Sequence, residues 1–264
     1  MVIAILKGRC VFLKVFVVKF RYIAAAAAAL ILIPAVYFWC TGSRETFSDN
    51  SRKIPIYSVE RDDNKISLTF DCAWNDSDMD DILKTLDDYN IKASFFVTGT
   101  WAEKYPQSVK KICEKGHDLG NHSYNHADYT KMTPAAITAD LDKCDAVVEG
   151  ITGQKMKLMR APSGGYNDTV VQTAEDSGRT YIQWSVDGLD YVRDATADSI
   201  KKRISKTEKG DIILMHNGTK LTAQVLPEII SLLSEKYELV KVSELIYNDN
   251  YSINNAGRQI CESN

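Results

Sequence analysis

Two histidines four residues apart are the first indication of chemistry in this sequence. His122 and His126 lie within residues 116–126, a stretch that holds three of the four histidines of the chain. If they sit one turn apart on a helix, both imidazoles lie on one face, where their nitrogens can converge on a cation. The alternative is a hydrogen-bonded histidine pair without a metal. The spacing alone is a weak signal, and a metal site becomes the favoured interpretation only with the reactive residues found elsewhere in the chain.

Other reactive side chains stand at the ends of short apolar runs that predict β-strands. Asp71 ends the run 66–71, Arg160 ends 157–160, and His216 directly follows 211–215. Asp187 and Asp190 come shortly after the run 180–185. In α/β barrels and open α/β sheets, functional sites gather at the carboxyl ends of the strands. We therefore expect these side chains to meet the two histidines at one rim.

Strand-like and helix-like stretches alternate between residues 54 and 246, which predicts an α/β fold with a parallel sheet or barrel. The predicted strands cover 66–71, 93–97, a short run ending near 121, 157–160, 180–185, 211–215 and 238–241. The predicted helices cover 78–89, 106–115, 134–149, a stretch beyond 167, 196–205 and 225–236. The polar residues 247–264 are expected to have little order.

The first 43 residues differ from the rest in charge and apolarity. All five of their charges are basic, and residues 22–43 are uncharged and largely apolar. About 20 apolar residues cross a bilayer as a helix, and flanking basic residues stay in the cytoplasm. The sequence predicts a cytoplasmic segment 1–21, a transmembrane signal-anchor 22–43 and a linker 44–53, with the remainder outside a cell membrane that is crossed once. A cleavable signal peptide is the alternative.

The rest of the chain is acidic, and its cysteines are scattered. After the basic residues of the N-terminal segment, 27 basic residues face 35 acidic ones, a balance of −8. Such a body argues against nucleic-acid binding, which normally uses a basic face. None of the six cysteines forms a Cys-x2-Cys pair, which argues against a zinc ribbon and a dense disulfide scaffold. A Cys113–Cys144 bridge is conceivable, and no protein partner can be inferred.

Five ordered motifs carry a family resemblance. They are Ser-Leu-Thr-Phe-Asp at 67–71, Asn-His-Ser-x-x-His at 121–126, Arg-Ala-Pro-Ser-Gly at 160–164, Trp-Ser-Val-Asp-Gly-Leu-Asp-Tyr at 184–191 and Leu-Met-His at 214–216. In this order they resemble polysaccharide deacetylases, the NodB-homology group of carbohydrate esterase family 4, and most of all sporulation-associated members. The resemblance covers residues 54–246. It implies a distorted (β/α)7-type barrel that removes acetyl groups from N-acetylated glycans of the cell wall.

The resemblance also implies roles for single residues. It implies a divalent metal, zinc, cobalt or manganese, held by His122 and His126, with Asp71 as the base that activates water. Arg160 would orient the base, and the backbone N–H of Ser163 would bind the oxyanion. His216 would be the acid, with Asp190, or Asp187 in reserve, as the carboxylate partner of His216. Leu214 and Tyr191 would contact the substrate. His117 has no catalytic part in this scheme.

One departure from the family pattern puts the activity in question. The first motif of the family reads Asp-Asp, and its second carboxylate binds the metal, but here that position is Cys72. A cysteine thiolate binds zinc, yet Cys72 is equally compatible with a small buried residue. Asp76 or Asp78 is an alternative source of the carboxylate. Three readings follow: an active deacetylase, a weak or inactive glycan-binding barrel in wall or spore assembly, or another metal-dependent hydrolase on the same fold.

Overall fold

The computed structural model describes residues 2–6, 9–13 and 52–262. The chain divides into two compact units, residues 1–51 and 52–264. In the first unit, β1 (Val2–Leu6) pairs antiparallel with β2 (Arg9–Leu13). The predicted signal-anchor, residues 22–43, lies outside the described residues. Within the described ranges, no helix has both the length and the apolarity that a bilayer crossing needs.

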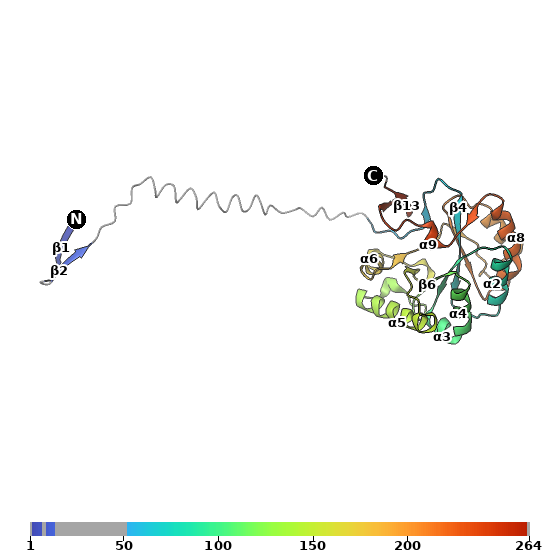
Figure 1. Ribbon diagram of the computed structural model, residues 1–264, viewed down its shortest axis with the longest axis horizontal. Helices are drawn as coiled ribbons and strands as arrows, with labels where there is room; N and C mark the ends of the chain where they lie inside the picture. The colour runs from blue at the N-terminus through green and yellow to red at the C-terminus, as the bar shows by residue number, and fades with distance from the viewer. Residues whose placement is uncertain (1, 7–8, 14–51, 263–264) are drawn as a thin grey trace. The chain divides into compact units, whose positions relative to one another are not determined.

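A curled parallel sheet of eight strands forms the centre of the second unit (Figure 1). In spatial order its strands are β8 (Thr180–Tyr181), β7 (Leu158–Met159), β6 (Asp118–Asn121), β5 (Ser94–Val97), β4 (Lys65–Cys72), β10 (Ile212–His216) and β9 (Val186–Asp187). The eighth strand, β11 (Glu238–Leu239), pairs with the start of β4. The predicted strands are confirmed, and β9 was not anticipated.

The sheet is an open half-barrel, and the expected distorted (β/α)7-type barrel is borne out to that extent. No strand ladder joins its edge strands β8 and β9 in the part of the chain that the structure describes. The segment before β4 lies at this gap, where Ile56 bridges to Ile182 and Ser58 bridges to Asp211. Strands of two residues, such as β8 and β9, offer too few hydrogen bonds for a continuous closed ladder.

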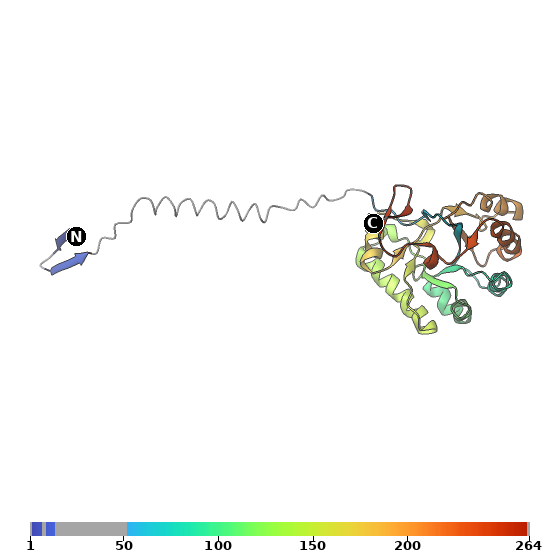
Figure 2. The ribbon, with the colours of Figure 1, turned by 45° about the horizontal axis from the view of Figure 1, so that its top comes forward.

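Helices cover the outer side of the curled sheet (Figures 1 and 2). They are α2 (Met79–Asp88), α3 (Gly99–Lys104), α4 (Pro106–Glu114), α5 (Pro134–Thr152), α6 (Asp168–Asp176), α7 (Ala197–Ile204), α8 (Thr222–Ser234) and α9 (Val242–Leu245), with 3-10 turns η1 (Tyr129–Lys131) and η2 (Pro162–Gly164). Side-chain oxygens of Thr98, Thr133, Asn167 and Thr196 cap the starts of α3, α5, α6 and α7. These caps fix where the helices begin after the site loops.

The two faces of β4 differ sharply in polarity. Ile66, Leu68, Phe70 and Cys72 belong to the large apolar core between the sheet and its helices. The alternate side chains of β4, from Ser67 to Asp71, point to the inner side, because successive residues of a strand face opposite ways. The strand therefore delivers its carboxylate to the inside of the half-barrel and its thiol to the outer core.

Residues 247–262 include two further strands, so the expectation of little order beyond residue 247 is wrong for this part of the chain. Strands β12 (Tyr251–Ile253) and β13 (Arg258–Cys261) form an antiparallel pair, and β13 pairs in parallel with β3 (Ser58–Val59). Gln259, which is fully buried, exchanges hydrogen bonds with the backbone of Tyr247. The polar composition did not indicate these strands, because β13 is held by β3, which lies far away in the sequence.

Candidate active site

The side chains predicted to be reactive surround one cavity of about 220 Å³ at the carboxyl ends of the central strands. Arg160 and Asp190 do not line it, but each contacts a residue that does. The lining residues are Asp71, Ala73, Trp74, His122, His126, Ser163, Trp184, Tyr191, Leu214 and His216. The structure therefore brings together residues from separate strands, as the strand-end argument predicts.

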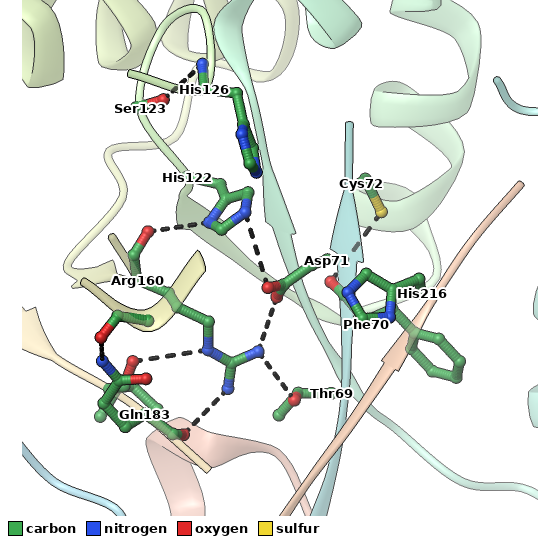
Figure 3. Close-up of polar contacts among 12 residues, drawn as sticks. Thr69, Phe70, Asp71, Cys72, His122, Ser123, His126, Arg160, Gln183 and His216 are labelled. Carbon is green, nitrogen blue, oxygen red and sulfur yellow. Dashed lines mark hydrogen bonds and ion pairs between the residues drawn. The ribbon is translucent and has the colours of Figure 1, made fainter. Parts of the chain in front are cut away.

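Asp71, near the end of β4, is held by a buried arginine. Arg160 donates from Nη1 to Asp71 Oδ1 at 2.6 Å, and the arginine side chain has no exposed surface (Figure 3). Burial alone would raise the pKa of Asp71, but the positive charge and the hydrogen bond of Arg160 contribute to lowering it below its usual range. Asp71 is therefore ionised at neutral pH, which is the state a general base requires.

The guanidinium of Arg160 is fixed on several sides. It donates to Thr69 Oγ1 at 3.0 Å and to the backbone oxygen of Gln183 at 3.1 Å. The ring centre of Phe96 lies 4.1 Å from its central carbon, within the range of a cation–π contact. An arginine with this many partners holds one orientation, and it imposes that orientation on the carboxylate of Asp71.

His216, the last residue of β10, is held by Asp190. Its Nδ1 lies 2.9 Å from Asp190 Oδ1, and its backbone N–H donates to Asp190 Oδ2 at 2.7 Å. Thr222 Oγ1 donates to the same Oδ2. Burial alone would lower the pKa of His216, but the Asp190 hydrogen bond and the neighbouring carboxylate charges outweigh it and raise the pKa. Asp187 instead accepts from the N–H of Leu189.

His122 and His126 lie on a loop after β6 and not on one helical turn. His122 directly follows β6, and His126 has a φ of 61°, in the left-handed region. The side chain of Asn121 accepts the N–H of Ser123 at 2.9 Å, and Ser123 Oγ accepts the N–H of His126 at 2.8 Å. The loop still brings the two ring centres to 5.2 Å.

The surroundings of His122 fix its proton. Its Nδ1 lies 2.8 Å from the backbone oxygen of Arg160, which only accepts, so Nδ1 donates and Nε2 carries a lone pair. Nε2 lies 3.5 Å from Asp71 Oδ2 (Figure 3). Burial lowers the pKa of His122 to about 4 and also lowers that of His126. Both imidazoles are therefore neutral near pH 7, the form that binds metal ions.

Neither Cys72 nor the nearby aspartates supply a third metal ligand in the part of the chain that the structure describes. Cys72 is fully buried in the outer core, and its sulfur lies on the side of β4 away from the imidazoles (Figure 3). Burial raises the pKa of this thiol well above its usual value, so it stays protonated. Asp76 accepts from Ser108, Asp78 accepts from the N–H of Gly218, and neither lines the cavity.

The donor set does not fit an ion held by three protein ligands. Among the residues that the structure describes, no three histidine, cysteine, aspartate or glutamate side chains are grouped to hold a metal. The reading of Cys72 as a small buried residue fits its surroundings, whereas a zinc-bound thiolate does not. His122 and His126 remain as two imidazoles on one side of the cavity.

Three residues that line or support the site had no role predicted from the sequence. Thr69 lies two residues before Asp71, so strand alternation alone places both on the inner face of β4. Trp74 follows the same strand in the loop that lines the cavity. No sequence pattern indicates a role for Thr222, the first residue of α8, because its contact with Asp190 joins segments far apart in the chain.

Two other sequence interpretations concern residues outside the cavity. His117 lies at the opposite end of β6, where its Nδ1 accepts the N–H of Ala93 at 3.1 Å, as suits a structural residue. Cys113 and Cys144 are free thiols, so the conceivable bridge between them does not form.

Known proteins resemble this chain over most of its second unit. The polysaccharide deacetylase profile matches residues 58–182. Peptidoglycan-N-acetylglucosamine deacetylase PgdA of Listeria monocytogenes is 35% identical over 197 residues, 74% of this chain. That alignment spans only 42% of PgdA.

Two solved structures show a similar fold. One is a family 4 carbohydrate esterase pseudoenzyme from Bacillus anthracis, 31% identical, with a TM-score of 0.69 over 72% of this chain and 68% of that one. The other is a mutant of that pseudoenzyme with restored enzymatic activity, 32% identical, with a TM-score of 0.69 over 72% of this chain and 70% of that one. With the motifs and the pocket described above, these likenesses show that the chain belongs to the polysaccharide deacetylases, the NodB-type group of carbohydrate esterase family 4.

Proposed function

We propose that this protein hydrolyses N-acetyl groups of a cell-wall glycan, peptidoglycan or a related polymer. The observation that carries the proposal is that Asp71 and His216 face one cavity, each held by a charged partner. Arg160 contacts Asp71 at 2.6 Å, and Asp190 contacts His216 at 2.9 Å. Amide hydrolysis needs a base for the water and an acid for the leaving amine, and the lowered pKa of Asp71 and the raised pKa of His216 favour these two forms.

The cavity residues take distinct parts in this proposal. Asp71 removes a proton from the water that attacks the acetyl carbonyl, and His216 protonates the amine as the C–N bond breaks, which leaves acetate and a free amino sugar. The backbone N–H of Ser163 serves the oxyanion. Leu214, which is buried at the cavity wall, packs against the acetyl methyl, and Tyr191 contacts the sugar.

A second function is favoured by the position of Cys72. Deacetylases of this family generally depend on a divalent metal. A site with two imidazoles and no third ligand is expected to bind zinc, cobalt or manganese weakly. The second candidate is therefore a glycan-binding barrel with little or no hydrolysis, which acts in wall or spore assembly. A pseudoenzyme among the similar structures supports the same candidate.

Acetate release separates the two functions. The purified full-length protein is incubated with peptidoglycan and with N-acetylglucosamine oligomers, in excess zinc, cobalt or manganese and separately in a chelator. The deacetylase proposal predicts acetate in excess metal and a loss of at least about a hundredfold in Asp71→Asn. Glycan binding without acetate under any condition would favour the second candidate.

The location is a proposal from the sequence alone. We propose a single-pass anchor in the cell membrane through residues 22–43, with the catalytic unit outside the cytoplasm. The proposal predicts that the protein stays in the membrane fraction and that protease added to intact protoplasts digests residues 52–264. Release into the medium as a shortened chain would instead indicate a cleaved signal peptide.

A further inference from the structure

The mouth of the cavity carries two exposed aromatic side chains. The large hydrophobic side chains exposed in the described ranges are Trp74, Tyr89 and Tyr191, with 49%, 41% and 46% of their surface accessible. Trp74 and Tyr191 both line the cavity, whereas Tyr89 does not. Leaving an indole half-exposed beside a site is unfavourable in water, so this pair marks a surface suited to an apolar partner.

Both aromatic rings contact His216. The indole of Trp74 stacks on the imidazole with ring centres 5.3 Å apart and an angle of 23° between the planes. The ring of Tyr191 meets the same imidazole edge-on at 4.8 Å and 67°. The imidazole therefore lies against two aromatic side chains, and all three residues line the cavity.

The chemistry of the substrate places a sugar ring in this space. In the proposed reaction, His216 protonates the nitrogen of an acetamido group. That nitrogen is bonded directly to a ring carbon of the sugar, so the pyranose ring must lie immediately next to the imidazole. The C–H groups of a pyranose form a weakly polar face, which packs on an aromatic ring and removes both surfaces from water.

We propose that Trp74 is the binding platform for the pyranose ring whose acetamido group reaches His216. The inference rests on the proposed function, in its hydrolytic or its binding form. Trp74 is two residues beyond Cys72, in the loop where this chain departs from the family motif. The ligand is an N-acetylated hexosamine polymer, and the contact is stacking rather than hydrogen bonding.

The test is calorimetric titration of the full-length protein with an oligomer of four N-acetylglucosamine units. Trp74→Ala is expected to weaken binding about tenfold, because the stacked surface is lost. Trp74→Phe, which keeps an aromatic ring, should retain most of the affinity. Trp74→Leu, which keeps apolar area without a flat ring, should behave like Trp74→Ala. Tyr89→Ala removes an equally exposed ring far from the cavity and should leave the dissociation constant unchanged.

The outcomes separate this inference from the proposed function. Binding by the unmodified protein together with an unchanged dissociation constant in Trp74→Ala would overturn the platform and leave the function standing. Equal affinity of the leucine and phenylalanine variants would also overturn it, since stacking would then be unnecessary. No glycan binding by the unmodified protein would overturn both. Thermal unfolding of each variant shows that any loss of binding is not a loss of fold.

Discussion

The two halves of the cavity, the acid–base half around Asp71 and His216 and the imidazole half around His122 and His126, differ in how firmly their side chains are fixed. In the acid–base half, Asp71 and His216 are each fixed by a charged partner and further hydrogen bonds. In the imidazole half, His122 is held through its Nδ1, but the described residues supply no group of three side chains that could hold a metal around it and His126. Both residues proposed for proton transfer are thus fixed by partners, whereas the described residues offer only two imidazoles for a metal.

Arg160 contacts both halves of the cavity. Its side chain holds Asp71, and its backbone oxygen holds His122. The comparison of the two halves indicates that the contacts that hold Asp71 and His216 do not depend on the residue at position 72. Cys72 contributes to the outer core, so its replacement of a carboxylate leaves the inner network intact.

The largest expected effect is on Arg160. Arg160→Met leaves the Asp71 carboxylate buried without its partner, so we expect the free energy of unfolding to fall by about 3–5 kcal/mol. The measurement is urea denaturation. Lys84→Met, at an exposed ion pair with Asp88, is the control and should change stability by less than about 0.5 kcal/mol. A similar loss in both variants would mean that the acid–base half is not anchored as described.

Asp190→Asn tests the acid. It keeps the size of the side chain but removes the charge that raises the pKa of His216, so that pKa should fall. We expect acetate release to drop about a hundredfold near neutral pH and its alkaline limit to move to lower pH. Because the pKa is raised in the folded state, the linked stability is present below about pH 6.5 and is lost as pH rises through the folded pKa.

The measurement for this variant is NMR titration of the histidine rings, with the His216 signal assigned from His216→Gln. Asp187→Asn is the control, since Asp187 accepts from the backbone rather than from His216. A smaller shift is expected in the control. An unchanged pKa of His216 in Asp190→Asn would contradict the assignment of Asp190 as its partner.

A smaller effect is expected at Thr69. Its hydroxyl donates to the backbone oxygen of Ile213 at 2.7 Å and accepts from Arg160 at 3.0 Å. Thr69→Val removes both contacts and should cost about 1–2 kcal/mol in urea denaturation. Ser67→Ala is a matched control on the same strand face, because the buried Ser67 hydroxyl has no hydrogen-bond partner among the described residues. Equal costs would show that the Thr69 contacts do not support the network.

Much of the site follows from the strand ends in the sequence. Asp71, Arg160 and His216 each close an apolar run, and parallel strands bring their carboxyl ends to one edge. The alternation in 66–72 also indicates that Cys72 faces the core opposite Asp71, a conclusion that the family motif obscured. The strand alternation therefore predicts the orientation of Cys72 better than the comparison with the family motif does.

The rest depended on contacts that no local pattern encodes. The loop of His122 and His126 is set by the side chains of Asn121 and Ser123 and by a left-handed residue, so helical spacing misleads there. The ordered C-terminal strands depend on β3, about two hundred residues earlier. Two-residue strands such as β9 are too short to show a period.

The most direct measurement compares acetate release by the natural protein, Cys72→Asp and Cys72→Ser in excess zinc. A carboxylate is costly to bury among the outer apolar side chains, which favours its turning toward the imidazoles to complete the ligand set. Because the acid–base half is already built, we predict at least about tenfold more acetate from Cys72→Asp, and no gain from Cys72→Ser. Equal release by both variants, or none from either, would contradict the account.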